Sequence, residues 1–483
     1  MANKLKTNFG YNLINVLTGL LFPLITFPYA SRVLMPSGIG QVQFYQSIIN
    51  YIALFTALGI PLYAVKEVAR VRDDKLERNR TTIEILILFV SLTLVGYFVV
   101  GGFCLFVSKV QEGMIIFLLL SLHLILVALG AEWFYQGIEE FRYITIRSFV
   151  VRILSLVCLF IFVKQPGDLV VYSLLIVLAE AGNNILNFIH LKKYLSFNGC
   201  FKELDVKRHI KPTLKIFVLN LIVSVYVNLD SVMLGFMTSN DAVAYYSAAT
   251  KLTRALMGIA TALGGVLLPY FSNEFSKGNL DAYKAMANKA ISYMVMFYLP
   301  LTVGLFMTAP QLIPLFCGSA YGPSIMTLKI LAPITLFLSI SSILGTRILY
   351  ARNLENIVIA STSIGALINF TLNYLLIPTL YQNGAAISSV IAEFFVTFSM
   401  LLFSRKYLNI EIFNKNSLAF LVFAIIMCLP IIIIQHMPIS TGLMFVVEVG
   451  FAGFVYFSLL LFSKNEVFDD LCRVTGINKF VRN

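Results

Sequence analysis

Asn228-Leu-Asp-Ser-Val-Met-Leu-Gly235 is followed in this chain by Asn240-Asp-Ala-Val-Ala-Tyr-Tyr-Ser247 and then by Lys251-Leu-Thr-Arg254. The pattern predicts the outer end of one membrane helix, a short turn, and a second helix that runs back inward. Lys251 and Arg254 are three residues apart, so they share one face of that second helix. At about 1.5 Å per residue they lie roughly 15 Å deep, near the bilayer midplane. A cation at that depth usually faces water or a partner and marks a pathway.

The same stretch repeats the beginning of the chain at a separation of 200 residues. Ser31, Leu34, Tyr45 and Ser47 correspond to Ser231, Leu234, Tyr245 and Ser247. Further matches, at separations of 213 and 215, join Leu178-Ala-Glu180 to Ile391-Ala-Glu393 and Glu132-Trp-Phe-Tyr135 to Arg347-Ile-Leu-Tyr350. Each predicted repeat holds six helices, an even number, so both copies run in the same direction. The sequence therefore predicts two parallel lobes with a substrate site between them.

The composition is that of a membrane protein. The 483 residues are 59% hydrophobic and only 12% charged, and the mean hydropathy is +0.85. Apolar stretches long enough to span a bilayer recur along the whole chain, which predicts an all-α integral membrane protein. Because these stretches are continuous rather than alternating, a β-barrel is excluded. The net charge of +12 does not indicate nucleic-acid binding, since the basic residues lie mainly in short loops between apolar segments.

About fourteen membrane spans are expected from the apolar stretches. They lie near residues 12–34, 41–63, 83–107, 114–136, 148–163, 169–190, 212–236, 242–270, 286–308, 326–349, 357–377, 384–403, 417–435 and 442–462. The predicted division of the chain is an N-lobe at 1–195, a cytoplasmic linker at 196–211, a C-lobe at 212–408, and two further helices with a cytoplasmic tail at 409–483.

The connecting segments alternate between basic and nearly cation-free. The basic set comprises 66–80, 192–211, 277–289 and 405–415, and the other set comprises 108–113, 164–168, 237–241, 378–383 and 436–441. Because basic loops stay on the cytoplasmic side, both termini are predicted to be cytoplasmic. The basic start of the chain is expected to belong to a retained first helix rather than to a cleaved signal.

Several other charges fall within or beside the predicted spans. Arg32 and Asp230 lie near the outer ends of the first and seventh helices, which begin equivalent repeats and are expected at the lobe interface. We expect Arg32, Lys251, Arg254 and Asp230 to line a cavity in which cations outnumber acids. Such a cavity suits an anionic group such as a diphosphate, because Arg binds phosphate oxygens bidentately and Lys acts as a compact charge.

A second set of charges is ambiguous. Arg152, Lys215, Arg347 and Glu132 lie near inner helix ends, where a long side chain can instead extend to the interface. Glu180 and Glu393 lie near mid-depth in both repeats, which favours a structural role in lobe packing and leaves coupling to H⁺ or Na⁺ as the alternative.

No enzyme signature is found in the sequence. The four histidines are far apart, and neither a carboxylate or cysteine cluster at metal-ligand spacing nor a phosphate-binding glycine-rich loop is present. We therefore predict no catalytic residue, no metal site and no cofactor.

Three segments carry a family resemblance: Glu132-Trp-Phe-Tyr-Gln-Gly-Ile-Glu-Glu-Phe-Arg-Tyr-Ile144, Asn228-Leu-Asp-Ser-Val-Met-Leu-Gly235, and Ile377-Pro with Asn383-Gly-Ala-Ala and Ala392-Glu393. They resemble bacterial O-antigen and polysaccharide flippases of the multidrug/oligosaccharidyl-lipid/polysaccharide exporter superfamily, over about residues 5–410. The resemblance implies a V-shaped, two-lobed fold in the bacterial inner membrane. It also implies that the protein moves undecaprenyl-diphosphate-linked oligosaccharide to the outer leaflet for surface polysaccharide (O-antigen, capsule or exopolysaccharide).

Three alternatives remain open. A cation-coupled multidrug exporter has the same fold, but it would more naturally present carboxylates and aromatic residues to its substrate. A peptidoglycan-precursor flippase shares the cationic cavity. A membrane enzyme of glycan assembly is disfavoured by the short outer loops and the missing catalytic clusters.

The predicted topology can be tested by thiol labelling. Single cysteines at Lys75 and Asn198 should react with an impermeant reagent only after the membrane is opened, whereas cysteines at Asp168 and Gln382 should react in intact cells. The reason is that basic loops are retained in the cytoplasm. Labelling of position 75 from outside would reverse the whole assignment.

Overall fold

The structure is a computed structural model, and it describes residues 2–195, 204–258, 280–408, 410–412, 414–463 and 465–475. Every regular element in these ranges is helical. The chain forms two compact units, Met1–Ala244 and Tyr245–Asn483.

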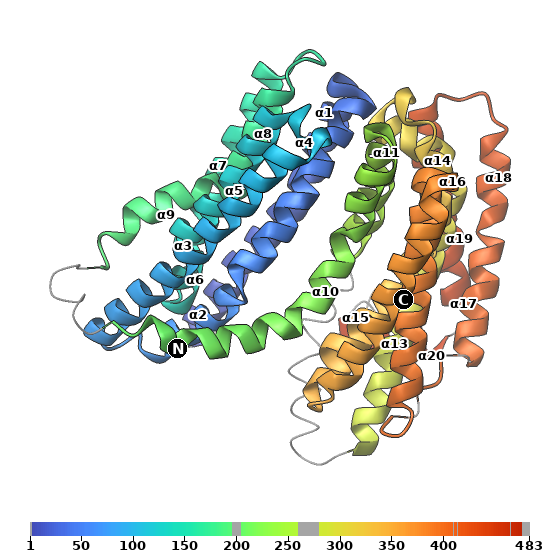
Figure 1. Ribbon diagram of the computed structural model, residues 1–483. Helices are drawn as coiled ribbons and strands as arrows, with labels where there is room; N and C mark the ends of the chain where they lie inside the picture. The colour runs from blue at the N-terminus through green and yellow to red at the C-terminus, as the bar shows by residue number, and fades with distance from the viewer. Residues whose placement is uncertain are drawn as a thin grey trace. The chain divides into compact units, whose positions relative to one another are not determined.

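The first unit is built around one long helix (Figure 1). Its elements are α1 (Ala2–Ala57), α2 (Ile60–Arg70), α3 (Lys75–Phe106), α4 (Ser108–Gln111), α5 (Met114–Gly130), α6 (Glu132–Gly137), α7 (Phe141–Phe162), α8 (Leu169–Val177), η1 (Leu178–Gly182), α9 (Asn183–Leu191), η3 (Val206–His209) and α10 (Ile210–Met237). α1 packs against α3, α5, α7 and α10. It contains two of the predicted spans, joined at Met35, where φ is 60° and ψ is 169°. Pro36 accounts for the loss of helical geometry, because a proline disfavours the helical conformation in the residue before it, but it does not explain the positive φ of Met35.

The second unit has its own apolar core. After α11 (Asn240–Leu256), which crosses the unit boundary, come α13 (Leu280–Cys317), η4 (Ser319–Tyr321), α14 (Ser324–Leu331), α15 (Ile334–Ile343), η5 (Leu344–Leu349), α16 (Glu355–Ser404), α17 (Lys415–Ile426), α18 (Cys428–Gln435), α19 (Thr441–Phe462) and α20 (Glu466–Thr475). α13 packs against α15, α17 and α19 and is the centre of this core. α16 contains two predicted spans that meet at Tyr381, where φ is 50° and ψ is −130°.

The helices agree with the predicted membrane spans. Ten helical segments in the described ranges are long and apolar enough to cross a membrane. Two of these segments, those of α1 and α16, each contain two predicted spans, which meet at the bends at Met35 and Tyr381. α10 and α11 cover the predicted spans 212–236 and the first part of 242–270, whose residues 259–270 lie outside the described ranges. The prediction of an all-α membrane protein with about fourteen spans is confirmed.

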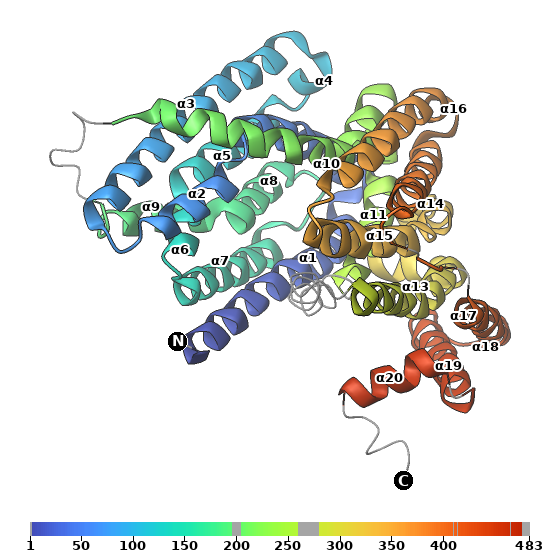
Figure 2. The same ribbon diagram turned by 90° about the horizontal axis from the view of Figure 1, so that it is seen from below.

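The second predicted span, 41–63, is interrupted close to its C-terminal end. The helix stops at Ala57, and Leu58 and Gly59 have φ of 43° and 74°. A side chain on Gly59 would come within 2.9 Å of the Thr213 carbonyl oxygen of α10, so a close helix contact requires glycine at this point. The chain then starts a new helix, α2, which packs side by side with α6 (Figure 2).

The predicted loop at 66–80 is also mostly helical. α2 continues to Arg70, and α3 already begins at Lys75. Asp74 caps α3, because its Oδ1 accepts hydrogen bonds from the backbone N–H groups of Leu76 (2.9 Å) and Glu77 (3.1 Å). The basic connection between the second and third spans is therefore short, and its charges lie mainly on helix ends.

The predicted lobe limits differ from the compact units. α10 was expected to open the second lobe, but it packs against α1 and α2 and belongs to the first unit, which ends at Ala244. The division at 195, 211 and 408 stays a prediction.

A buried carboxylate fixes the start of α10 to the first unit. The Glu84 side chain, in α3, is completely buried. It accepts hydrogen bonds from Arg80 Nε (3.1 Å), Asp205 N (2.7 Å) and Arg208 Nε (2.7 Å). A buried charge is tolerated when it is paired and hydrogen-bonded in this way.

His209 completes this cluster. Its Nε2 lies 2.8 Å from Glu84 Oε2, and its Nδ1 lies 2.8 Å from the Tyr63 hydroxyl of α2. Burial lowers the pKa of His209 despite the adjacent carboxylate. A neutral imidazole that donates from Nε2 to Glu84 and accepts at Nδ1 from Tyr63 satisfies both contacts. The cluster therefore joins α2, α3 and η3.

Replacing Glu84 should destabilise the protein strongly. In Glu84→Gln the paired arginines and His209 lose their buried counter-charge, which typically costs about 3–5 kcal/mol. The matched control is Glu77→Gln, because Glu77 pairs with the same Arg208 at 3.1 Å but is about one-third exposed, and exposed pairs contribute about 0–1 kcal/mol. Thermal unfolding in detergent should show a much larger loss for Glu84→Gln. Equal losses would contradict the structural role of the buried carboxylate.

Candidate functional site

The predicted outer charges of the first unit lie on α1 and α10. Arg32 is exposed, and its Nη1 donates a hydrogen bond of 2.6 Å to the carbonyl oxygen of Pro28, one turn earlier. Asp230 is 7% exposed. It interacts electrostatically with Tyr51 of α1, the residue that sequence alignment of the repeats pairs with Lys251. Both charges therefore have contacts within the first unit.

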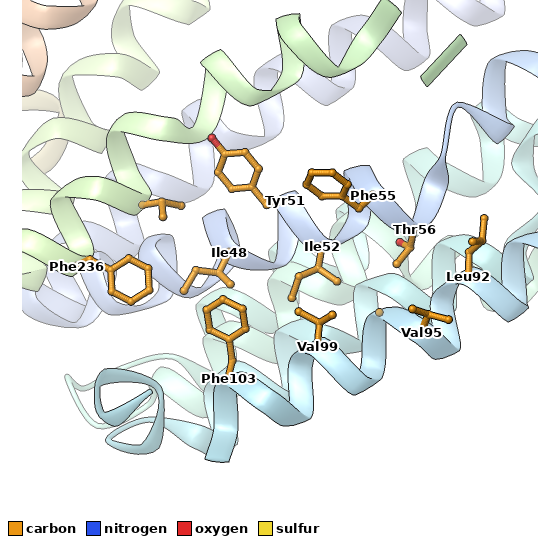
Figure 3. A pocket seen from close by; sticks show the side chains of 12 residues that line it. Ile48, Tyr51, Ile52, Phe55, Thr56, Leu92, Val95, Val99, Phe103 and Phe236 are labelled. Atoms are coloured by element: carbon orange, nitrogen blue, oxygen red, sulfur yellow. The ribbon is translucent and has the colours of Figure 1, made fainter. Parts of the chain in front are cut away.

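An apolar cavity of about 410 Å³ lies next to this region (Figure 3). It is formed by α1, α3 and α10, and its lining residues are Ile48, Tyr51, Ile52, Phe55, Thr56, Leu92, Val95, Gly96, Val99, Phe103, Val232 and Phe236. α1 and α3 approach closely at its wall, since a side chain on Gly96 would come within 2.4 Å of Thr56. Tyr51 and Thr56 supply its polar atoms, so the cavity suits a hydrocarbon chain better than a sugar.

The cationic pair of the second unit lies on α11, as predicted. Lys251 is half-buried and Arg254 is exposed, and each has contacts within the structure. The opposite face of α11 is anchored to α16, because the Tyr246 hydroxyl lies 3.0 Å from Ser389 Oγ. Tyr246, Ala249 and Thr253 are buried on that face. Ser247 and Ala248, one turn before Lys251, are buried as well, so α11 is packed on several sides and Lys251 and Arg254 lie where its exposure increases.

The four central candidates belong to different units: Arg32 and Asp230 to the first, Lys251 and Arg254 to the second. Their grouping in one cavity stays a prediction.

The secondary candidates have mixed surroundings. Glu132 accepts from Arg147 Nη2 at 3.1 Å, which joins α6 to α7. Arg152 Nη1 donates to Asn15 Oδ1 (3.1 Å) and Thr18 Oγ1 (2.8 Å), which joins α7 to α1. These contacts favour packing roles for Glu132 and Arg152. Lys215 is exposed on α10, and Arg347 is half-buried in η5.

The two repeated glutamates have unlike surroundings. Glu180, in η1, is 47% exposed, accepts from Gln46 Nε2 at 3.0 Å, and lies 3.9 Å from His123 Nδ1. Glu393, in α16, is 2% exposed and accepts a 2.6 Å hydrogen bond from Ser341 Oγ. Equivalent places in the repeat therefore do not give equivalent environments.

Lys109 is a functional candidate that the sequence did not reveal. It lies on α4, and its Nζ donates to the carbonyl oxygens of Gly235 (2.6 Å) and Thr238 (2.7 Å) at the C-terminal end of α10. A lysine there satisfies carbonyl groups that the helix leaves open and complements the helix dipole. The only sequence signal was a lone cation in an outer connection otherwise poor in cations.

Glycine permits the close packing around Lys109. A side chain on Gly235 would come within 1.9 Å of the Phe44 ring, and one on Gly40 within 1.7 Å of the Asn240 carbonyl oxygen. The segment from Asn228 to Asn240 is thus fixed against the beginning of the second span by backbone contact.

Groups of three or more His, Cys, Asp or Glu side chains that could hold a metal ion are not found among the described residues.

Comparisons with known proteins agree with the fold. Residues 5–275 match the sequence profile of the polysaccharide biosynthesis protein family. Over 84% of this chain and 98% of its own length, a putative O-antigen transporter of Escherichia coli (strain K12) is 22% identical. A putative O-antigen transporter of Shigella dysenteriae is 26% identical over 79% of this chain and 95% of its own length.

Solved structures show the same fold at low sequence identity. The lipid II flippase MurJ in an inward closed conformation has a TM-score of 0.68 and 17% identity, covering 92% of this chain and 99% of that chain. An inward-facing multidrug resistance MATE family transporter of the MOP superfamily has a TM-score of 0.64 and 16% identity, covering 80% and 93%. The resemblance to polysaccharide flippases is confirmed, and the chain belongs to the polysaccharide biosynthesis protein family.

Proposed function

We propose that this protein is a flippase that moves undecaprenyl-diphosphate-linked oligosaccharide from the inner to the outer leaflet of the bacterial inner membrane by alternating access. The membership in a polysaccharide biosynthesis family and the likeness to O-antigen transporters support a polysaccharide flippase. The observation that carries the finer proposal is the pair Lys251 and Arg254, one turn apart on α11. Two cations at membrane depth match a diphosphate.

Each part of the proposed substrate has a candidate contact. The diphosphate binds Lys251 and Arg254, and Arg32 and Asp230 stay predicted members of the cationic cavity. The isoprenoid tail packs in an apolar groove, for which the cavity beside Tyr51 has suitable lining. The lipid stays within the bilayer while the polar head crosses through the protein.

Coupling to H⁺ or Na⁺ is assigned to Glu180 rather than Glu393. Glu180 is half-exposed beside Gln46 and His123, which suits reversible binding of a cation. Glu393 is buried on a serine hydroxyl, which supports a packing role in the second unit.

Charge removal at the α11 pair should abolish transport. Lys251→Ala and Arg254→Ala should each lose surface polysaccharide while the protein stays in the membrane. Arg254→Lys should keep part of the activity, because the charge remains but the bidentate fork is lost. Arg254→Glu should be worst, since like charges repel strongly at low dielectric.

The measurement is surface polysaccharide per membrane-inserted protein in a deletion strain that carries each variant. The matched control is Arg405→Ala, which removes an exposed cation just after α16 and should leave transport unchanged. Full export by the Lys251→Ala/Arg254→Ala double variant at normal abundance would remove the pair from the mechanism and make Arg32 the better anion site.

A further inference from the structure

A cationic pocket of about 630 Å³ lies in the first unit between the beginning of α7 and the end of α9. It is separate from the residues proposed for transport, and it overlaps the segment Glu132–Ile144 that carries the family resemblance. The lining residues are Glu140, Arg142, Tyr143, Ile146, Arg147, Val150, Leu186, Ile189, His190 and Lys193. Three permanent cations and a histidine thus face one acid.

The decisive residue is Arg147. Its side chain is only 3% exposed, and its Nη2 donates to Glu132 at 3.1 Å. Its Nε and Nη1 are buried and have no hydrogen-bond partner in the protein. Buried donors are nearly always satisfied, and an unpaired buried donor is unfavourable, more so on a charged group. The arginine is therefore built to receive an acceptor from outside the chain.

Ring and hydrogen-bond contacts join the two helices around Arg147. Tyr143 stacks on His190 with ring centroids 4.5 Å apart, and its hydroxyl donates to the carbonyl oxygen of Leu186 at 3.2 Å. The Arg147 guanidinium lies 5.4 Å from the centre of the Tyr143 ring. These contacts hold α7 and α9 together beside the Arg147 guanidinium.

The acceptor must be an amphiphile, because the pocket continues into an apolar surface. Ile146 and Val150 are one turn apart on α7, Leu186 and Ile189 one turn apart on α9, and all four are exposed. Arg142 and Lys193 are exposed at the charged end of this surface. A phosphate there would meet cations, and hydrocarbon chains attached to it would meet aliphatic side chains.

We propose that this pocket binds an anionic phospholipid of the cytoplasmic leaflet. Its phosphate accepts hydrogen bonds from Arg147 Nε and Nη1, Arg142 and Lys193 surround the head group, and the acyl chains lie along Ile146, Val150, Leu186 and Ile189. Basic pockets between helices at the cytoplasmic side are suited to such head groups. The pocket borders the basic segment from Lys192, which the loop charges place in the cytoplasm.

The test is lipid binding by the purified full-length protein. Delipidated protein is titrated with phosphatidylglycerol or phosphatidylcholine, and bound lipid is counted by native mass spectrometry. Phosphatidylglycerol should bind in preference, and Arg142→Ala/Lys193→Ala should weaken it about tenfold or more, since each basic residue near a lipid surface contributes substantially. Arg147→Lys, which keeps the charge of the pair with Glu132 but removes the fork, should also weaken it.

The matched control is Lys66→Ala/Lys75→Ala, which removes two exposed cations from α2 and α3 and should leave binding unchanged. Equal weakening by both double variants would show nonspecific attraction and overturn the proposal. So would displacement of the lipid by inorganic diphosphate alone, which would indicate a site for free phosphate groups. Preference for undecaprenyl diphosphate over phosphatidylglycerol would instead assign the pocket to the transport substrate. None of these outcomes depends on surface polysaccharide, so the proposal can fail without the flippase assignment failing.

Discussion

The cost of burying charge in a membrane protein organises much of this structure. An ionised group removed from water is tolerated when a partner and hydrogen bonds surround it. Glu84 meets this condition with Arg80, Arg208 and His209, and this cluster, with Tyr63 on His209, joins α2, α3 and η3. Arg147 meets this condition only in part. Its Nη2 donates to Glu132, whereas its Nε and Nη1 have no hydrogen-bond partner in the protein. The first arrangement holds helices together, and the second leaves a site for a ligand.

The stretch from Asn228 to Gly235 and the helix that follows it are held in place by close contacts. Its glycine at 235 allows the Phe44 ring to lie directly on the helix backbone, and Lys109 closes the carbonyl end of the same helix. The next helix, α11, is held by buried small residues and by Tyr246 on Ser389. A firmly anchored helix can present Lys251 and Arg254 at a defined depth, which a mobile one could not.

Hydropathy was enough to predict the membrane class and nearly every span, because continuous apolar segments and helix length follow directly from bilayer thickness. It failed where a local contact decides the backbone, as at Gly59 against Thr213 and at the Asp74 cap. For the site, the sequence could predict only which charged residues lie within the membrane spans. Glu84 and Lys109 were missed because Arg208, which pairs with Glu84, and Gly235, which accepts from Lys109, lie more than a hundred residues away in sequence, which no local pattern records. The repeat also suggested equal roles for Glu180 and Glu393, although one is half-exposed and the other buried.

The most direct test of the flippase assignment is the fate of lipid-linked glycan in cells that lack this protein. Lipids extracted from the deletion strain are analysed by mass spectrometry, and sidedness is judged by whether the glycan is accessible to a sugar-binding protein added to intact spheroplasts. The account predicts that an undecaprenyl-diphosphate-linked oligosaccharide accumulates, that it is inaccessible from outside, and that surface polysaccharide is lost. Unchanged surface polysaccharide without any accumulated lipid-linked glycan would contradict it.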